Sequence, residues 1–228
     1  MDERRQSTTK QRILDTAERL FASGGVHSTS LRGLTAEAKV NLAAVNYHFG
    51  SKEALLQAVF ERRLIPLNKA QRDRLEAVRK NAQALSARPS VRDALHAFFE
   101  PLLSVRDSGP AAENFLRLLG RSFAEPDETV RKITLRHMGP VLILLFDISA
   151  QALPHLPRDC LFWRLNLALG TMPHVLSVNF SALPPSVTPP RSAFMTGLIL
   201  DFLTAGLEAP CTGNSSRMEQ PAQVFGDT

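Results

Sequence analysis

The sequence has few of the features that mark secreted, membrane-embedded or disulfide-rich proteins. It contains two cysteines, which are too few for a disulfide framework and favour a reducing compartment. Residues 1–6 are charged and no apolar segment follows them, so no signal peptide is expected. The most apolar run, Val141–Phe146, ends at Asp147 and falls short of the roughly 20 residues of a membrane span. These absences predict a cytoplasmic protein with no membrane partner.

An excess of one charge sign is also nearly missing, since 27 basic and 22 acidic residues give a net charge of +5. The first 63 residues carry ten basic and seven acidic residues, a net charge of +3. A second basic stretch, Arg62–Lys80, is interpreted as a solvated helix face. Such a mild excess permits a nucleic-acid partner without requiring one.

The residue groupings that an enzyme needs are not visible. None of the six histidines forms a His-x-x-x-His pair, the two cysteines are far apart in sequence, and no Gly-rich phosphate loop follows a strand. We therefore predict no catalytic residue, no metal site and no cofactor.

The pattern of apolar residues predicts an all-α fold, because no segment alternates apolar and polar residues with β-branched enrichment. Four helices are expected in the first third, over about 8–23, 30–38, 42–49 and 52–65. A capping box at Thr8-x-x-Gln11 opens the first, and Ser30, Asn41 and Ser51 cap the others. Pro66 is expected to kink or interrupt the fourth helix.

Longer and more apolar helices are expected in the rest of the chain, separated by proline-bearing connections. They are predicted at Ser90–Val105, Pro110–Ala124, Asp127–Leu153, Arg158–Ala182 and Arg191–Leu207. Residues 209–228 are polar and are predicted to form a disordered tail. We therefore divide the chain into a head (1–63), a body (64–208) and this tail.

The segment Ser30–Phe49 predicts a helix-turn-helix, in which the second helix lies in the DNA major groove. In that helix the small side chains of Ala43 and Ala44 allow close approach to the groove, and Asn46 carries an amide that suits an adenine edge. Val45 and Phe49, one turn apart, should point back into the core of the head.

At these residues the sequence resembles the TetR family of transcriptional regulators. The resemblance lies in Arg12–Phe21, Thr29–Arg32 and, most specifically, Val45–Leu55, and it covers about the first 60 residues. The chain has Lys39 in the turn, where the family usually has glycine, so that either Lys39 has an unfavourable φ or the turn adjusts.

The resemblance implies that the head binds double-stranded DNA, with one group of residues at the bases and another on the phosphates. Thr29 and Ser30 would cap the second helix and meet a phosphate, and Tyr47, His48 and Lys52 would hold the backbone. For Tyr47, His48 and Asn46 the alternative is a packing or helix-stabilising role. The predicted DNA-binding residues are Thr29, Ser30, Asn41, Leu42, Ala43, Ala44, Asn46, Tyr47, His48 and Lys52.

The resemblance also implies that the body binds a small apolar effector. Each of its aromatic residues taken singly fits the core, and together they can also line a pocket between helices. The predicted effector-binding residues are Phe98, Leu102, Phe115, Leu119, Phe146, Phe162, Trp163 and Asn166. Polar residues within apolar helix patterns could hold a polar head group, and these are Arg117, Arg121, His137, Arg164, Asn166 and His174.

The last two predicted helices are apolar on more than one side, which predicts a two-fold homodimer through a four-helix interface. The predicted dimer residues are Leu167, Val175, Met195, Ile199 and Phe202. Within the family, Val40–Lys52, Arg117–Arg121 and Leu161–Arg164 resemble the branch that responds to fatty acids or acyl-coenzyme A. A sensor of drugs or aromatic compounds, and a helical adaptor that does not bind DNA, remain as alternatives.

Overall fold

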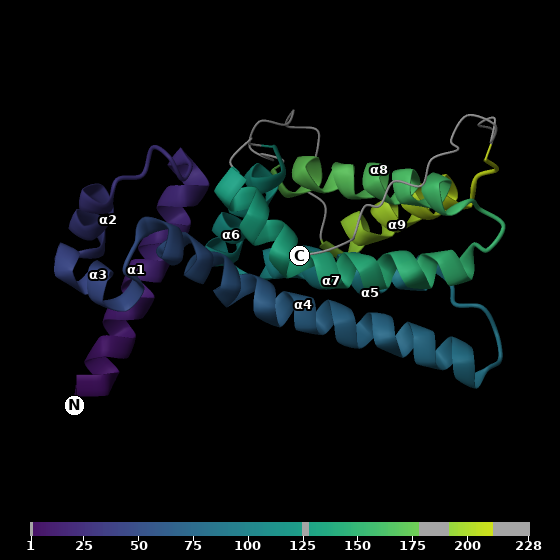
Figure 1. Cartoon of the computed structure of the whole chain (residues 1–228), viewed down its shortest axis with the longest axis horizontal. Coiled ribbons are helices and arrows are strands. Elements are labelled where there is room, and N and C mark those ends of the chain that lie inside the picture. Colours follow the sequence, from purple (N-terminus) through teal and green to yellow (C-terminus); the bar gives the residue numbers. More distant parts are fainter. Residues whose placement is uncertain (1, 125–127, 178–191, 212–228) are drawn as a thin grey trace.

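A small helical head is joined to a larger helical body by one long helix (Figure 1). The computed structural model describes residues 2–124, 128–177 and 192–211, and every regular element within them is helical, as predicted. The head contains α1 (Asp2–Gly24), α2 (Leu31–Ala38) and α3 (Leu42–Phe49). The ends of the last two predicted helices next to the gap at 178–191, and the predicted tail beyond residue 211, lie outside the described residues.

The helices of the head begin at residues whose side chains satisfy free backbone N–H groups. The Ser30 hydroxyl accepts a hydrogen bond from the N–H of Gly33 at 3.0 Å, and the Asn41 side chain accepts one from Ala44 at 2.8 Å. Ser51 caps the next helix in the same way, so the three predicted caps are confirmed. The predicted start of α1 near Thr8 is wrong. The helix begins at Asp2, because Glu, Arg and Gln at positions 3–6 favour a helix.

Helix α4 (Lys52–Ala84) runs through Pro66 without ending there, so the expected interruption does not occur. A proline inside a helix removes one backbone hydrogen bond and costs about 3 kcal/mol. Pro66 lies on the exposed side of α4, while Leu64 and Leu67 on the opposite side are buried in the core. The packing of this inner face offsets the cost, and α4 continues from the head along the whole body.

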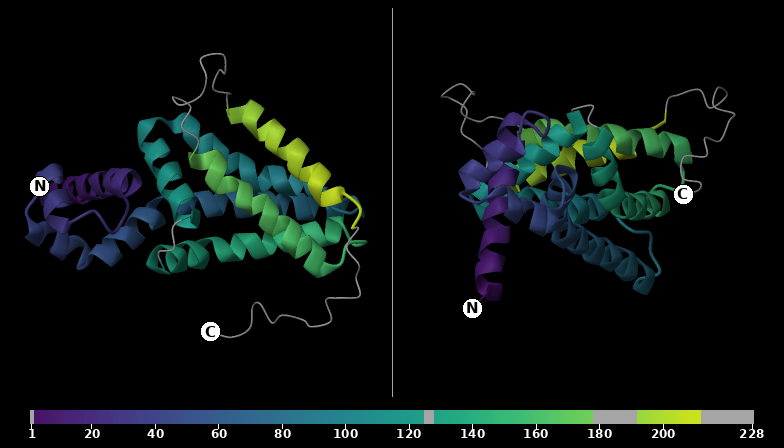
Figure 2. Two further views of the ribbon diagram at one scale, coloured as in Figure 1. Left: turned by 90° about the horizontal axis from the view of Figure 1, so that it is seen from above. Right: turned by 60° about the vertical axis from the view of Figure 1, so that its left-hand side comes forward.

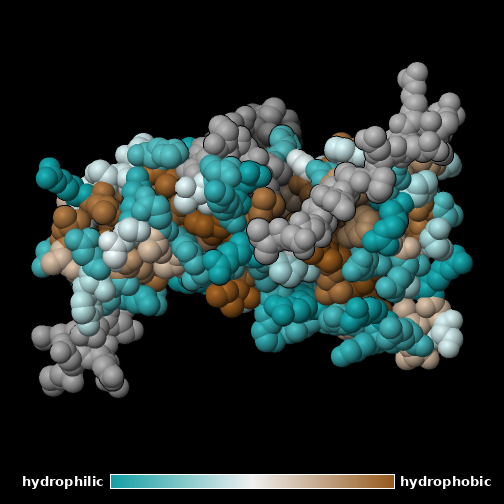
Figure 3. Space-filling model, viewed as in Figure 1, coloured by the Kyte–Doolittle hydropathy of each residue, from teal (hydrophilic) through white to brown (hydrophobic). Residues whose placement is uncertain are grey.

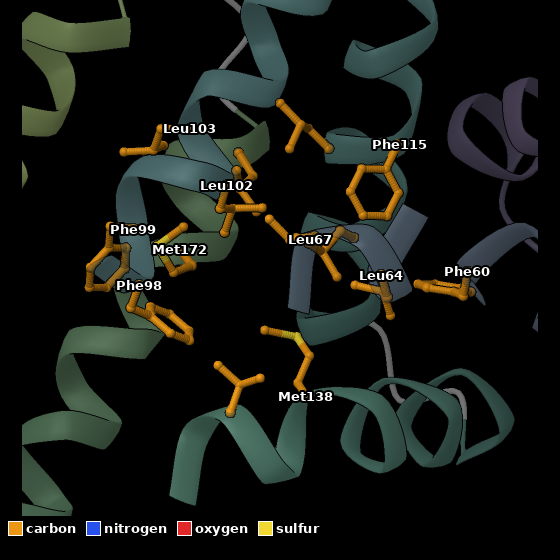
Figure 4. Packing of buried hydrophobic residues seen from close by; sticks show 14 of the residues in the cluster. Phe60, Leu64, Leu67, Phe98, Phe99, Leu102, Leu103, Phe115, Met138 and Met172 are labelled. Carbon is orange, nitrogen blue, oxygen red and sulfur yellow. The ribbon is translucent and has the colours of Figure 1, made fainter. Parts of the chain in front are cut away.

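The body consists of α4 and the helices that pack on it, namely α5 (Val91–Ser104), α6 (Pro110–Ala124), α7 (Glu128–Ala152), α8 (Arg158–Ser177) and α9 (Ser192–Glu208), with a 3-10 turn at Val105–Ser108. Helices α5 and α7 pack against α4, while α8 packs on α6 and α9 on α5 (Figure 2). Apolar side chains from α4 to α8 converge in the centre, as Figure 4 shows for Leu67, Phe98, Phe115, Met138 and Met172.

The outer side of α4 is the solvated basic face that the sequence predicts. Hydrophilic residues cover this edge of the molecule (Figure 3). Lys69 forms an ion pair with Asp73 at 2.6 Å, and Arg79 forms one with Glu76. Three basic residues of the stretch, Arg62, Arg63 and Arg79, are partly withdrawn from solvent.

Helix α7 is the one described helix that is long and apolar enough, by length and composition alone, to cross a membrane. The apolar run Val141–Phe146 is only part of this helix, which continues on both sides of the run. Its buried residues recur every three or four positions, from Val130 to Ser149, and α7 packs along α4. This one-sided stripe is the pattern of a core helix in a helical bundle.

Candidate nucleic-acid interface

One side of α3 is buried in the head, and the other side is open to solvent. Val45 is fully buried and Phe49 packs against the same core, so the predicted inward face is confirmed. Leu42 and Tyr47 have 43% and 73% of their surface exposed, and Asn46 is also exposed. Residues 42, 43, 46 and 47 share one face at helical spacing. A short apolar and amide-bearing surface with a phenol at its end therefore projects from the head.

Near this face, two hydroxyl residues directly precede α2, and the structure places their side chains differently. Ser30 is exposed, and its oxygen already accepts the hydrogen bond from Gly33, so its O–H remains available to donate to a phosphate. Thr29 is 8% exposed, and its hydroxyl donates to the carbonyl of Gly25 at 2.9 Å. The predicted phosphate contact of the Thr29 side chain does not fit this position, because the loop after α1 buries it.

The turn between α2 and α3 has the strain that its sequence predicts. Lys39 has φ 52° and ψ 49°, the left-handed conformation that favours glycine. Its N–H reaches the carbonyls of Thr35 and Ala36, and its own carbonyl accepts a hydrogen bond from Arg12 at 3.2 Å. The turn therefore closes normally around a residue with a side chain, and the basic Lys39 is exposed beside α3.

The end of α3 carries an aromatic and basic group that suits the DNA backbone. The Tyr47 and His48 rings meet edge to face with centroids 5.1 Å apart. Lys10 lies over the Phe49 ring, with its Nζ 6.0 Å from the centroid. Lys52 begins α4 directly after the Ser51 cap. Helix α3 contains no acidic residue. Its exposed face therefore offers hydrogen-bond donors and no carboxylate that would repel a phosphate.

A buried ionic cluster fixes the head on α4, and the sequence analysis did not find it. Glu18 of α1 is 2% exposed, and it accepts hydrogen bonds from Arg62 at 2.6 Å and from Arg63 at 2.9 and 3.0 Å. Arg62 also binds Asp15 at 2.6 Å. Burial disfavours the charge of Arg62, but hydrogen bonds to Glu18 and Asp15 outweigh it and raise its pKa. The sequence does indicate this burial, because Glu18 lies on the same helix face as the apolar residues Leu14 and Phe21.

A second contact joins the head to the body at the other end of α1. Arg121 of α6 donates to the carbonyls of Ala22 and Ser23, at 3.4 and 3.3 Å. A cation at the C-terminal end of a helix satisfies free carbonyls and complements the helix dipole. Arg121 therefore acts between head and body, and not as the holder of a ligand's head group that the sequence suggested.

Two family models match this chain, and together they cover both of its parts. One, described as bacterial regulatory proteins of the tetR family, matches residues 13–59, which include α2 and α3. The other, described as the tetracyclin repressor-like C-terminal domain, matches residues 96–206 of the body. The chain belongs to the TetR family of transcriptional regulators. The expectation drawn from the residues around α3 is thereby confirmed.

Curated relatives match stretches of about 50 residues of this TetR chain. The nicotine-responsive repressor HdnoR of Paenarthrobacter nicotinovorans is 45% identical over 49 residues, which are 22% of this chain and 25% of that protein. The transcriptional regulator UidR of Escherichia coli K12 is 37% identical over 51 residues, again 22% of this chain and 26% of the relative. The chain thus matches about a quarter of the length of these relatives.

Solved structures extend the likeness in fold to the body. FadR of Bacillus subtilis, solved in complex with stearoyl-CoA, superposes with a TM-score of 0.63 over 86% of this chain and 98% of that one, at 13% identity. FadR of Bacillus halodurans gives 0.63 over 89% and 97%, at 14% identity. At such low identity these matches establish the shared fold alone.

The predicted effector-binding residues separate into three groups in this TetR body: buried, partly buried and exposed. Phe98, Leu102, Phe115 and Leu119 are buried in the centre, at most 1% exposed. Phe146 and Phe162 are partly buried, and Phe146 lies under the Arg158 guanidinium at 4.9 Å. Trp163 is 56% exposed and Asn166 is exposed, so neither lines the interior. Their positions on the outer face of α8 were hidden in a helix that is apolar on several sides.

A surface hollow of about 530 Å³ lies at the far end of the body, between the end of α4 and the start of α5. Its lining includes Arg74, Leu85, Arg88, Asp93 and His96. The eight predicted effector residues do not line it, and it is more polar than the effector site that the sequence suggests. The central residues of Figure 4 remain the better candidates for an apolar effector.

Helices α8 and α9 carry a row of exposed apolar side chains. Of the predicted dimer residues, Leu167 is 74% and Phe202 73% exposed, whereas Val175 and Met195 are half-buried. Ile199 is 8% exposed and packs inward, which does not fit its predicted role. Two further exposed residues of α9 were not predicted from the sequence. Phe194 and Leu198 precede Phe202 at intervals of four, a spacing that could have identified them.

Proposed function

We propose that the chain is an effector-responsive transcriptional regulator that binds a two-fold symmetric DNA site as a homodimer. The observation that carries this proposal is the solvent-exposed face of α3, where Leu42, Ala43, Asn46 and Tyr47 lie together on a helix anchored by Val45. A helix of this kind fits the major groove with its first residues against base edges. The exposed Ser30 and Tyr47 and the half-buried Lys52 would hold phosphates on either side.

A dimer follows from the small size of this surface. One eight-residue helix contacts few base pairs, whereas two heads in fixed relation read both halves of an inverted repeat. The exposed row Trp163, Leu167, Phe194, Leu198 and Phe202 on α8 and α9 supports a partner copy there. Large apolar side chains gathered on one face are typical of an interface. In a two-fold dimer the same row meets itself.

The proposed effector is a small apolar molecule such as a fatty acid or an acyl-coenzyme A. The apolar centre between α4 and α8 would accept a chain, and the likeness in fold to FadR with stearoyl-CoA supports this class. Gln71 is fully buried there, and its Oε1 has no hydrogen-bond partner among the described residues. Such an acceptor suits an N–H or O–H donor, which acyl-coenzyme A carries and an ionised fatty acid does not.

Two other functions have less support. A sensor of drugs or aromatic compounds would use the same interior, but the similarity to the nicotine-responsive repressor covers only 22% of this chain. A helical adaptor without DNA would leave the exposed face of α3 and its match to the family model unexplained.

We infer that effector binding reaches DNA through two connections between body and head. Helix α4 is continuous from Lys52 to Ala84, and Glu18 fixes α1 on it through Arg62 and Arg63. Arg121 joins α6 to the end of α1. An effector that binds the DNA-incompetent arrangement more tightly would lower DNA affinity, with a typical coupling of about 1–3 kcal/mol.

The DNA interface is tested by measuring the affinity of the full chain for a duplex selected from random sequences. Replacing Tyr47 by Ala removes a phosphate contact, so affinity should fall about equally for specific and unrelated duplexes. Asn46→Ala should lower affinity mainly for the selected duplex, by about 1–3 kcal/mol. Leu85→Ala, an equally exposed site at the far end of α4, serves as the control and should change neither. Unchanged binding in both head variants would contradict the proposed interface.

The effector class is tested by adding palmitoyl-coenzyme A, free palmitate or nicotine to the protein–DNA complex. The proposal predicts that an acyl ligand releases DNA and that nicotine does not. Gln71→Leu, which keeps the side chain buried but removes its acceptor, should weaken the acyl effect while DNA binding without ligand stays intact. Release by nicotine alone would support the aromatic-compound alternative.

A further inference from the structure

The only two cysteines of the sequence lie next to each other in the folded chain. The Sγ atoms of Cys160 and Cys211 are 2.8 Å apart, although 51 residues separate them in sequence. Cys160 is in the first turn of α8, and Cys211 follows the end of α9. Both are free thiols, with Cys211 exposed and Cys160 partly exposed. The two cysteines are far apart in sequence, and only the packing of α8 against the end of α9 brings them together.

A neighbouring arginine holds Cys211 in this position. Arg164 lies one helical turn after Cys160 on the same side of α8. Its guanidinium donates to the carbonyls of Leu207 at 2.7 Å and Pro210 at 3.0 Å, and to that of Ala209 between them. Arg164 thus caps the C-terminal end of α9 and fixes the three residues that lead to Cys211. One turn of α8 therefore carries both the group that fixes the segment and the thiol that meets it.

We propose that Cys160 and Cys211 form a reversible intrachain disulfide, a modification site that oxidised glutathione or a similar disulfide can address. In the first step the Cys211 thiolate attacks one sulfur of oxidised glutathione, whose S–S bond breaks and releases one glutathione thiolate. In the second step Cys160 attacks the Cys211 sulfur of the mixed disulfide and releases the second glutathione. The two protein thiols lose two electrons and two protons, and one molecule of oxidised glutathione takes them up and becomes two molecules of reduced glutathione.

The environment of each thiol gives this order. Cys211 is exposed and meets the oxidant first. The hydrogen bond with Cys211, followed by partial burial, raises the pKa of Cys160, so the Cys160 thiol stays protonated until its partner has reacted. Once Cys211 carries glutathione, Cys160 is already within contact distance of its sulfur. In a reducing cytosol the pair remains a dithiol, and it closes when the glutathione pool is oxidised.

The disulfide would connect the start of α8 to the residues after α9, at one end of the apolar row on these helices. Cys160 lies one turn before Trp163, and the residues that Arg164 holds follow Leu207 directly. The link would fix α9 on α8 in the oxidised chain. The proposed disulfide does not depend on the proposed DNA binding, because its formation is measured in the absence of DNA.

The test incubates the full chain in glutathione mixtures from fully reduced to fully oxidised, blocks free thiols with N-ethylmaleimide and determines intact mass. The proposal predicts that the doubly labelled chain is replaced by an unlabelled chain that has lost two hydrogens, and that dithiothreitol reverses the change. Cys160→Ser should accumulate one bound glutathione, because no second thiol resolves it. Arg164→Ala should slow closure of the disulfide severalfold while both thiols stay reactive.

Thermal unfolding provides the second readout. The oxidised wild-type chain should unfold at a higher temperature than the reduced chain, and Cys160→Ser should show no such difference. Two labelled thiols at every glutathione ratio would overturn the proposal, as would disulfides that form only between chains on a non-reducing gel. An oxidised chain no more stable than the reduced one would overturn the link between α8 and α9.

Discussion

Lys39 occupies a backbone conformation that a side chain disfavours. Replacing it by glycine relieves the φ of 52° and leaves its hydrogen bonds intact, because they use backbone atoms. We expect Lys39→Gly to raise the free energy of unfolding by about 1 kcal/mol. Urea unfolding measures the change. Ala36→Gly, at an exposed helical position of α2, should instead lower it by a similar amount, and a loss of stability in Lys39→Gly would contradict the strain.

At the same scale, sequence reasoning was accurate where the chemistry is local. Ser30, Asn41 and Ser51 were assigned as caps because a cap needs only its own side chain and the next turn of backbone. Thr29 was placed on a phosphate because its neighbours define a helix start, but its exposure depends on the loop that covers it. The burial of Glu18 likewise depends on α4, far along the chain, which explains why the ionic cluster was missed.

Between elements, the Glu18 cluster should contribute much of the attachment of α1 to α4. Glu18→Gln would leave Arg62 and Arg63 partly buried without their counter-charge, and we expect a loss of about 3 kcal/mol in unfolding free energy. Asp15→Asn removes an ion pair to the same Arg62 at a position 66% exposed, and should cost less than about 1 kcal/mol. Equal effects in urea unfolding would contradict a special role for the buried carboxylate.

The extent of whole elements was predictable in part. The ends of α2 and α3 carry caps and turn residues, so their bounds follow from sequence. Helix α4 exceeds its prediction because proline was expected to interrupt it, while burial of Leu64 and Leu67 against the body carries the helix onward. The mechanism depends on this difference, because a continuous α4 can transmit a shift of the body to the head.

For the whole molecule, the exposed apolar row on α8 and α9 predicts a dimer that a single charge should disrupt. Phe202→Asp would place a carboxylate on the proposed self-complementary apolar face. Light scattering after size-exclusion chromatography should then give the mass of one chain in place of two. Leu85→Asp, at a 78% exposed site on the far end of α4, should leave the mass of the dimer unchanged. A wild-type chain that is a monomer would contradict the interface.

Acid should destabilise the fold through exposed carboxylates that are hydrogen-bonded. A hydrogen bond from its own backbone, followed by one from Ser51, lowers the pKa of Glu53. Hydrogen bonds from Lys69 and Arg131 lower the pKa values of Asp73 and Glu128, respectively. Because the folded values are depressed, the folded chain binds fewer protons, and stability present at neutral pH is lost as pH falls below about 5. Urea midpoints should be level from pH 7 to about 5 and decline below that. A level profile down to about pH 3 would contradict these shifts.

The body illustrates what a sequence leaves undetermined. Phe98 and Phe115 belong to the core by their burial, yet core and pocket use the same residue types and helical spacing. Trp163 was expected inside the body and is exposed, whereas Ile199 was expected at the dimer surface and is buried. Helices α8 and α9 are apolar on several sides, and only their packing against α6 and α5 determines which side is buried. Positions around α3 were predictable because a short motif defines them.

The central claim is that α3 of two copies reads one symmetric DNA site. Selection from random duplexes by the full-length wild-type chain, followed by sequencing, tests it most directly. The account predicts an inverted repeat with half-sites about 10 base pairs, or a multiple of one helical turn, apart, and no enrichment with Asn46→Ala and Tyr47→Ala combined. Enrichment of a single unrepeated motif, or none above the unselected pool, would contradict it.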